Sequence, residues 1–414
     1  MDNRITVTEL CARLPPRTAT TISKRGDNSE TVTEATHPQL HRENRAARPR
    51  GTAGEADGGT LRVTWMMLPG QRPWRELYWL SLMPGAKVTA VGEPRPPEPV
   101  AFVRRPYQRL TRRFVEAGAL AWLRDLDTVP SVRDGGWVAS LELCSLVTGQ
   151  VSALARRRGL RQAVLIWGND PHSPLYRLPP YRQALNRARD ADLFVCFIEA
   201  ARDHCVALGL PAERCVVVPP GVDTELFQPA PHPVAEPVAI FASPLVGNKG
   251  IDRVLDAFRL VRQRLPEARL EVVGRGPLED LVRREAARAG SGVAFRGFRD
   301  QRGVAAALRR AAVFVTAPRA NLTWNEQFGL AYVEAMACGL PVVTTICGSN
   351  HEAVRPPNLR VPDDAEALAE GLLGFLADPA KRARVGAANR RHVTERHELR
   401  RQCALLGEAF RAGA

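Results

Sequence analysis

The chain has 414 residues and a formal net charge of +14. This length is sufficient for two domains, each with its own hydrophobic core. No apolar run is long enough to cross a bilayer, and the N-terminus lacks the continuous apolar segment of a signal peptide. The eight cysteines show neither a Cys-x-x-Cys pair nor a zinc-like spacing with histidine, so we expect reduced thiols, no metal site and a cytoplasmic location.

The positive charge is carried almost entirely by arginine, since only four of the 58 basic residues are lysines. Arginine clusters such as those at 156–158, 309–310 and 390–391 fall in predicted helices, which favours solvated helix faces. An anionic membrane surface or an anionic substrate is the second interpretation. A nucleic-acid partner is not expected, because no basic stripe with interleaved aromatic residues and no known nucleic-acid module is present.

Residues 1–58 are predicted to be a disordered tail. They are rich in Thr, Arg, Glu, Asn and Gly and have almost no apolar periodicity. Frequent acidic residues in this stretch argue against an organelle-targeting peptide.

Strand and helix patterns alternate from Leu61 onward, as is typical of doubly wound parallel sheets. The first half predicts strands at 61–68, 87–91, 137–141, 163–167, 193–197 and 215–218, with helices at 142–158 and 181–191. The second half predicts strands at 238–242, 270–273, 293–296, 313–316, 342–345 and 359–361, and helices at 252–265, 278–289, 304–312, 329–338 and 365–377. A Pro-rich linker follows residue 218. We therefore predict an α/β fold of two Rossmann-like domains facing across a cleft, residues 59–228 and 229–397.

The most informative segment runs from Asn325 to Pro341 and contains two carboxylates, Glu326 and Glu334, eight positions apart. The first precedes a Phe-Gly turn and the second lies in the second turn of a short helix that Gly339 should end. The start of a helix gathers unpaired backbone N–H groups and the positive end of the helix dipole, which suits a phosphate. The flanking carboxylates can accept hydrogen bonds from sugar hydroxyls. Each carboxylate alone is more often a solvated helix residue or a dipole partner, so the interpretation depends on their combination.

This arrangement resembles the E-x7-E signature of the retaining glycosyltransferases of family 4, which have the GT-B fold. The resemblance covers roughly residues 61–409 and is densest in the second half. It implies that Glu334 bonds the ribose hydroxyls of a nucleotide sugar and that Glu326 bonds the hydroxyls of the transferred sugar. The backbone amides of Phe328, Gly329 and Leu330 would bind the phosphate. In this fold the last helical segment, 398–414, usually completes the first domain.

The segment 243–250 resembles the diphosphate-binding loop of the same family and supplies Lys249. By the resemblance, Lys249 would stabilise negative charge on the leaving diphosphate, although an exposed turn lysine is the alternative. Many relatives carry Arg where this chain has Pro244, so one cation of the usual pair is missing. Arg319 is a candidate replacement, with an exposed loop arginine as the alternative interpretation.

Further site candidates follow from the same resemblance. In the second half these are Gly274, in a Gly-x-Gly turn, and Phe298, in the region where the nucleotide base is held. In the first half, Trp167 occupies the position of a histidine that commonly touches the donor sugar. It could stack on a sugar or simply pack in the core. Asp170 and His172 are the other acceptor-side candidates.

The resemblance implies transfer of a glycosyl group from a nucleotide diphosphate sugar to an acceptor hydroxyl, with retention and without a metal or cofactor. An Arg-rich chain of this kind fits bacterial secondary-metabolite or glycoconjugate biosynthesis. Two alternatives remain: a nucleotide-sugar-binding GT-B protein without transfer activity, and a GT-B epimerase or phosphorylase. We expect a soluble acceptor rather than peripheral membrane contact, because no basic amphipathic helix with an aromatic face is visible.

Overall fold

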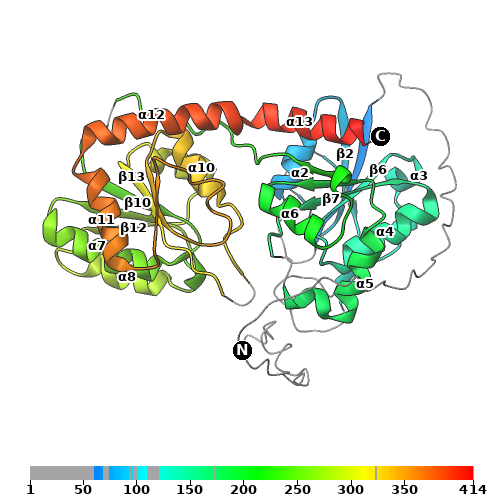
Figure 1. Cartoon of the computed structure of the whole chain (residues 1–414), viewed down its shortest axis with the longest axis horizontal. Coiled ribbons are helices and arrows are strands. Elements are labelled where there is room, and N and C mark those ends of the chain that lie inside the picture. Colours follow the sequence, from blue (N-terminus) through cyan, green and yellow to red (C-terminus); the bar gives the residue numbers. More distant parts are fainter. Residues whose placement is uncertain are drawn as a thin grey trace, which may run out of the picture.

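The computed structural model describes residues 60–68, 74–93, 95–96, 100–109, 121–170, 173–232, 234–321 and 324–413. Within them, two parallel β-sheets form the cores of two α/β domains that lie side by side (Figure 1). The predicted disordered tail, residues 1–58, lies outside the described residues.

The first domain is built on a seven-stranded parallel sheet with strand order β3-β2-β1-β6-β7-β8-β9. These strands are β1 (Leu61–Met66), β2 (Ala86–Gly92), β3 (Ala101–Arg104), β6 (Trp137–Leu141), β7 (Arg161–Ile166), β8 (Leu193–Cys196) and β9 (Cys215–Val217). The strands β4 (Tyr107–Arg109) and β5 (Ala121–Leu123) form a separate antiparallel pair. The helices of this half are α2 (Trp74–Ser81), α3 (Pro130–Arg133), α4 (Leu146–Arg158), α5 (Pro179–Ala188) and α6 (Glu199–Ala207).

The second domain has a six-stranded parallel sheet with strand order β12-β11-β10-β13-β14-β15. Its strands are β10 (Val238–Ala242), β11 (Arg269–Val273), β12 (Val293–Gly297), β13 (Val313–Thr316), β14 (Val342–Thr345) and β15 (Leu359–Val361). Its helices are α7 (Ile251–Arg264), α8 (Glu279–Ala287), α9 (Gln301–Leu308), α10 (Leu330–Ala337), α11 (Ala365–Leu376) and α12 (Pro379–Arg396).

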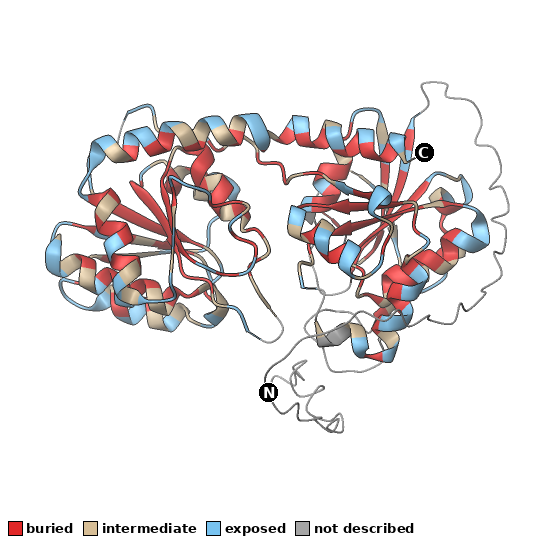
Figure 2. Ribbon diagram, viewed as in Figure 1, coloured by how far each residue is buried: buried red, intermediate tan, exposed pale blue. Residues whose placement is uncertain are grey.

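The central strands are apolar along their whole length because helices cover both faces of each sheet. Every residue of β6 and of β10 is buried. Figure 2 shows buried strands inside both domains and helices whose outer faces are exposed. In each sheet the strand order reverses at one point, between β1 and β6 in the first and between β10 and β13 in the second. Ligands of such sheets bind outside the carboxyl ends of the strands at these points.

Two successive helices connect the domains along one side of the molecule (Figure 1). The first, α12, packs against α10 and α11, and the second, α13 (Leu399–Ala412), packs against α2 and β8 of the first domain. Between them, the buried His397 forms a 2.9 Å hydrogen bond through Nδ1 with the carbonyl of Pro220. Val222 also pairs with this segment, since its N–H donates to the His397 carbonyl at 2.7 Å. The two crossings of the chain between the domains are therefore hydrogen-bonded to each other.

The structure confirms the predicted fold class and every predicted strand to within two residues. The helix predicted from residue 142 was placed too early. Glu142 has a positive φ of 62°, and the Ser145 side chain caps the true start by accepting a hydrogen bond from the Val147 N–H. The prediction also missed the helices α2, α3, α6 and α12 and the strands β3, β4 and β5.

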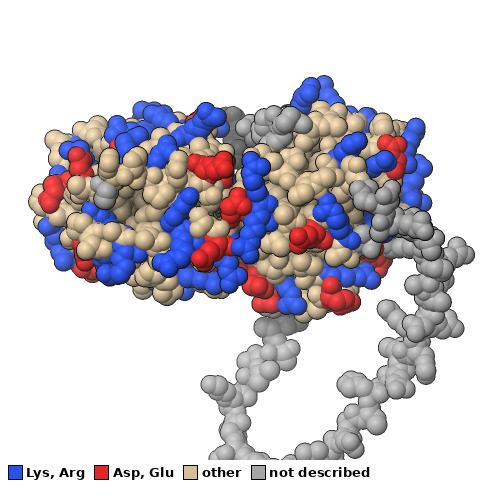
Figure 3. All heavy atoms as spheres, turned by 90° about the horizontal axis from the view of Figure 1, so that it is seen from above, with Lys and Arg blue, Asp and Glu red and all other residues tan. Residues whose placement is uncertain are grey.

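Surface charge is spread rather than gathered. Arg and Lys side chains are scattered over both domains on the face shown in Figure 3, with Asp and Glu among them. Some arginines of the chain are paired, as Arg157 and Arg158 are with Asp127. Among the described residues, no helix is both long and apolar enough to cross a membrane.

Candidate active site

Two loops that leave neighbouring strands of the second sheet form the centre of the site. The chain passes from β10 into residues 243–250 and from β13 into residues 317–329, and these two strands are adjacent at the point where the strand order reverses. Because both loops start at the carboxyl edge of one sheet, Lys249 of the first meets Glu326 of the second across 77 positions of sequence.

Lys249 and Glu326 form an ion pair. The Lys249 ammonium donates to Oε2 of Glu326 at 2.6 Å, and the two side chains are 21% and 9% exposed. Shielding from water strengthens such a pair relative to one at the surface. The sequence predicted separate contacts for the two groups, diphosphate for Lys249 and sugar hydroxyls for Glu326. Those contacts stay predictions. The structure adds that the cation and the carboxylate are in direct contact.

The lysine loop is laid directly on the loop that follows β13. The N–H of Arg319 donates to the carbonyl of Asn248 at 3.0 Å, and the N–H of Ala317 donates to the carbonyl of Lys249 at 3.4 Å. This approach requires glycine at position 250, where φ is +69° and a Cβ atom would lie 1.8 Å from the carbonyl oxygen of Ala317. Lys249 is therefore held in place by its own backbone.

We expect Gly250→Ala to lower Tm sharply and to abolish donor binding. The new methyl group can be accommodated only if the lysine loop moves off the second loop, and the backbone conformation is strained for alanine in any case. Gly247→Ala is the matched control, because a Cβ atom at Gly247 meets nothing within 4 Å. Calorimetric unfolding and nucleotide titration check both variants. A Gly250→Ala protein with wild-type Tm and binding would contradict this description of the loops.

The backbone of Glu326 is held by the turn that follows β14. The N–H of Ser349 donates to the carbonyl of Glu326 at 2.8 Å. At Gly348, where φ is +52°, a Cβ atom would lie 2.2 Å from the same carbonyl oxygen. The backbone of Glu326, and with it the carboxylate, is thus positioned by a second loop from the same edge of the sheet.

Arg319 is engaged within the site's own framework. Its guanidinium contacts both carboxylate oxygens of Asp252, at 2.6 and 2.5 Å, and the carbonyl of Gly247 at 3.3 Å. The geometry gives this side chain a role in joining the two loops. Its proposed contact with the diphosphate stays a prediction, and the carboxylate of Asp252 already offsets its charge.

The N-terminus of α10 presents free donors beside Glu326. Among the described residues, the backbone N–H groups of Phe328, Gly329 and Leu330 have no hydrogen-bond acceptor. Gly329, with φ of 84°, begins the helix without a side-chain cap. The Phe328 ring is buried and lies 5.6 Å from that of His397. The donors that the sequence assigned to a phosphate are therefore unused, and the residue that leads into them is anchored at the crossing between the domains.

Glu334 lies in the second turn of α10. Unlike Glu326, it forms no ion pair with any described residue. Burial raises the pKa of the Glu334 carboxyl to about 7, while the positive charge of Arg75 on α2 acts in the opposite direction. A carboxylate without a partner has unused acceptor capacity. This matches the predicted ribose contact, which stays a prediction.

The nucleotide-sugar-binding candidates Gly274 and Phe298 directly follow the neighbouring strands β11 and β12. Gly274 allows a close approach, because a Cβ atom there would lie 2.2 Å from the carbonyl oxygen of Ser243 in the lysine loop. The Phe298 ring is 57% exposed, and the guanidinium of Arg275 lies 4.4 Å from its centroid. An exposed aromatic ring at this edge is available for stacking.

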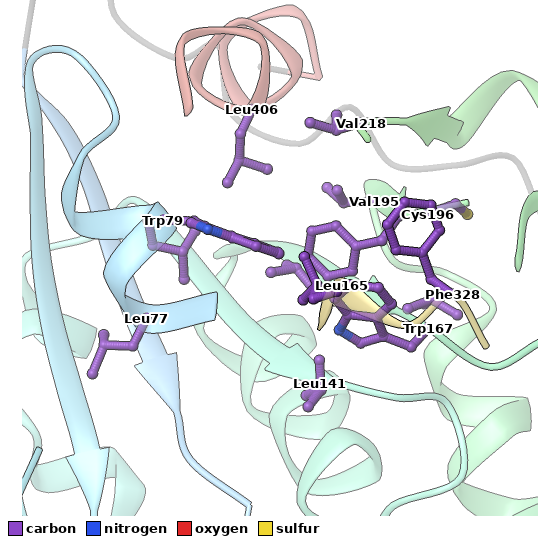
Figure 4. Close-up of a cluster of buried hydrophobic side chains, with 14 of the residues drawn as sticks. Leu77, Trp79, Leu141, Leu165, Trp167, Val195, Cys196, Val218, Phe328 and Leu406 are labelled. Atoms are coloured by element: carbon purple, nitrogen blue, oxygen red, sulfur yellow. The ribbon is translucent and has the colours of Figure 1, made fainter. Parts of the chain in front are cut away.

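The Trp167 side chain is packed in a hydrophobic core. Its side chain is 9% exposed, its Nε1 donates to Oε1 of Glu76 at 2.8 Å, and its ring lies 4.5 Å from that of Phe197. Figure 4 shows Trp167 in one buried cluster with Trp79 and with Phe328 of the second domain. This burial favours the packing alternative, and stacking on a sugar stays a prediction. Because the cluster joins the domains, Trp167 supports the turn at Phe328 indirectly.

The other first-domain candidates remain untested. Asp170 is exposed, three residues beyond Trp167, and its carbonyl accepts a 3.3 Å hydrogen bond from the N–H of Ser173. His172 lies outside the described residues.

Sequence reasoning missed two contacts between the domains. Nδ2 of Asn169 donates to Oγ of Ser349 at 2.8 Å. The Glu352 carboxylate accepts 2.8 Å hydrogen bonds from the N–H groups of Glu199 and Ala200, which start α6 in the first domain. The turn 348–352 therefore caps a helix of the opposite domain.

Glu142 is a further carboxyl of the first domain, and it is half-buried. Burial raises its pKa to about 7, against the opposing effect of hydrogen bonds from the N–H groups of Trp167 and Gly168. It follows β6 with a positive φ, a conformation that no sequence pattern reveals for glutamate. Among the described residues, no cluster of His, Cys, Asp and Glu has the makings of a metal site.

Comparisons with known proteins agree with this geometry. Residues 222–392 match the family model described as glycosyl transferases group 1. The chain is 31% identical over 275 residues to the GDP-mannose-dependent alpha-(1-6)-phosphatidylinositol monomannoside mannosyltransferase of Mycolicibacterium smegmatis, covering 62% of this chain and 71% of that protein. It is 33% identical over 226 residues to the phosphatidyl-myo-inositol mannosyltransferase of Mycobacterium tuberculosis, covering 51% of this chain and 55% of that protein.

Two solved structures share the fold. HepE of Anabaena, in complex with UDP and glucose, matches with a TM-score of 0.63 and 19% identity over 85% of this chain and all of that one. Sucrose-phosphate synthase of Thermosynechococcus elongatus matches with a TM-score of 0.61 and 19% identity over 85% of this chain and 98% of that one. The chain is therefore a member of the glycosyl transferases group 1 family, a glycosyltransferase of the GT-B fold that uses a nucleotide-sugar donor.

Proposed function

We propose that this enzyme transfers a hexosyl group from a nucleoside diphosphate to an acceptor hydroxyl with retention of anomeric configuration, and that GDP-mannose is its donor. The observation that carries the proposal is the placement of the Lys249–Glu326 pair beside unpaired N–H groups at the start of α10. The choice of donor is supported by the relatives whose names specify GDP-mannose.

The site offers a partner for each part of such a donor. The N–H groups of residues 328–330 face a phosphate with the positive end of a helix dipole. Glu334 can accept hydrogen bonds from the ribose hydroxyls, and Glu326 can accept them from the hydroxyls of the transferred sugar. In this assignment the donor lies along α10, with Glu334 at the ribose end of the donor and Glu326 at the sugar end.

The negative charge that develops on the leaving diphosphate gives Lys249 a role in turnover. As the glycosidic bond breaks, negative charge grows on the leaving diphosphate, and a preorganised cation stabilises that state more than the ground state. Lys249 and the start of α10 supply positive charge without an additional ion, so we expect turnover to persist in excess chelator.

Contacts between the domains support a closed state that excludes water. Glu352 holds the start of α6, and Asn169 holds Ser349 beside the backbone of Glu326. Closure of this kind protects a reactive donor from hydrolysis and completes the site.

For the acceptor we propose a soluble hydroxyl-bearing molecule of a bacterial secondary-metabolite or glycoconjugate pathway. The relatives are named for phosphatidylinositol mannosides, whose acceptors carry a phosphate. In this chain, the side chains at the first-domain edge of the cleft include the carboxyls of Glu142 and Asp170, which repel an anion when charged.

A vesicle experiment separates these acceptors. The protein should remain in the supernatant with vesicles containing phosphatidylinositol at physiological salt, because its arginines are dispersed and partly paired. Sedimentation with such vesicles that is reversed by salt would contradict a soluble acceptor and favour a lipid-linked one.

A donor panel tests the proposed activity. GDP-mannose should raise Tm more than UDP-, ADP- or dTDP-sugars, since a ligand that binds only the native state stabilises it by mass action. It should also be slowly hydrolysed to GDP when no acceptor is present. Binding without any turnover would indicate a nucleotide-sugar-binding protein. A donor converted to an epimer, or phosphorolysis of a glycoside, would indicate the other alternative chemistry.

A further inference from the structure

Trp324 covers the lysine of the ion pair. The Nζ atom of Lys249 lies 4.8 Å from the centroid of the Trp324 ring and 2.6 Å from Oε2 of Glu326. An aromatic face attracts an ammonium group because its quadrupole is negative above the ring. The lysine side chain, 21% exposed, is thus bounded by a carboxylate on one side and an indole on another.

The loop that carries Trp324 is tied to the loop that carries Lys249. Within it, the N–H of Asn321 donates to the carbonyl of Trp324 at 2.8 Å. At its start, Arg319 bonds both Asn248 and Asp252. The indole and the ammonium therefore approach each other from two backbones that are hydrogen-bonded together, so the contact does not depend on a mobile surface side chain.

We propose that Trp324 is a positioning residue for Lys249, which rests on the proposed role of Lys249 toward the leaving diphosphate. A lysine has a flexible four-carbon stem and no fixed donor geometry, so its ammonium needs external restraint. Glu326 supplies one restraint, but a single carboxylate permits many ammonium positions. The ring removes the positions that lie away from the carboxylate and keeps water off the pair. The ammonium is then already in place when a donor enters.

A direct contact between the ring and the donor sugar is the competing explanation, and it makes a different prediction. If Trp324 stacked on the sugar, its removal would harm binding and turnover whether or not Lys249 were present. If it acts through Lys249, its removal should have no further effect once the lysine has been replaced. A double-mutant cycle distinguishes the two.

The lysine content of the chain allows a test that does not depend on activity. Lys249 is one of only four lysines. Acetylation of each lysine by a small amount of an amine-reactive acetylating reagent can therefore be followed by peptide mass spectrometry of the full chain. Lys381 lies 4.6 Å from the Phe375 ring and serves as an internal control for a shielded lysine. Lys87 is exposed and reports overall reagent access.

We expect Trp324→Leu to raise the acetylation rate of Lys249 about 3- to 30-fold and Trp324→Phe to raise it much less, because phenylalanine retains an aromatic face. The rates at Lys87 and Lys381 should not change. Trp122→Leu, which removes a half-buried indole from β5 of the first domain, should leave all of them as in the wild type. Equal acetylation of Lys249 in the wild type and in Trp324→Leu would overturn the proposal, as would an increase at every lysine.

The kinetic arm uses GDP-mannose hydrolysis. Trp324→Leu should lower kcat about 3- to 30-fold with little change in KM, and it should have no effect in a Lys249→Met background. An equal loss in both backgrounds would assign the ring to the sugar instead. If the wild type binds GDP-mannose but never turns it over, the proposed function fails. The acetylation result then still decides whether Trp324 positions the lysine.

Discussion

Lys249→Ala should lower kcat for GDP-mannose about 10²- to 10³-fold, equivalent to about 2.7–4 kcal/mol, by analogy with the removal of one preorganised oxyanion donor. The loss should fall on kcat because the ammonium acts most strongly on charge that develops in the transition state. Donor affinity should change much less. Steady-state kinetics combined with calorimetric titration of the donor measures the two quantities separately.

Two further variants sharpen that experiment. Lys381→Ala removes another lysine that lies against an aromatic ring, on α12, and should leave kcat unchanged. Pro244→Arg in the Lys249→Ala background should recover part of the loss, because Pro244 is exposed in the same loop and many family members carry arginine there. A Lys249→Ala enzyme with wild-type turnover would refute the role of the cation.

Glu334→Gln should weaken GDP and GDP-mannose equally, by about 10- to 150-fold, since a hydrogen bond to a charged group contributes about 1.5–3 kcal/mol. The carboxylate must be ionised to accept from both ribose hydroxyls. Its pKa is raised to about 7 by burial, so GDP affinity should fall as the pH drops below 7 in the wild type but not in the variant. Calorimetric titration of GDP between pH 5.5 and pH 8.5 checks both statements. Equal affinities for wild type and variant would show that Glu334 does not contact the nucleotide.

Because the pKa of Glu334 is raised, we also expect Glu334→Gln to be more stable than the wild type at high pH. A group whose pKa is higher in the folded state contributes stability below its unfolded pKa and loses that contribution as pH rises through the folded value. Ligand-free Glu334→Gln should therefore have a higher Tm than the wild type at pH 8 and a similar Tm near pH 4.5. Glu285→Gln should show the opposite sign at pH 8, because the hydrogen bond from Arg259 holds the pKa of Glu285 below its usual value. A lower Tm for Glu334→Gln at pH 8 would contradict the assigned burial.

The sheet pattern was predictable because buried parallel strands are continuous apolar runs, as in β6 and β10. The helix α12 was not, because its sequence is Arg-rich with weak periodicity and is helical through packing on α10 and α11. Both Lys249 and Glu326 were identified from local motifs. Their ion pair was not, since it depends on the adjacency of β10 and β13, which local sequence does not state.

Trp167 shows a different limit. A tryptophan after a strand is compatible with a ligand or with a core, and only the surrounding residues decide between them. Here its partners come from separate elements: Glu76 from α2, Phe197 from the end of β8 and, through the shared cluster, Phe328 from the second domain. Glu352 shows the same limit, because its carboxylate accepts hydrogen bonds from the start of α6, which lies in the other domain. Contacts between domains carry no local sequence signal.

The central claim is retaining transfer from GDP-mannose at the start of α10, and the stereochemistry of donor hydrolysis tests it most directly. Wild-type enzyme would be mixed with GDP-mannose, whose mannosyl linkage is α, and the first-formed anomer of free mannose followed by proton NMR before mutarotation. The proposal predicts that α-mannose appears first together with GDP. Initial release of β-mannose, or no release of GDP at all, would contradict it.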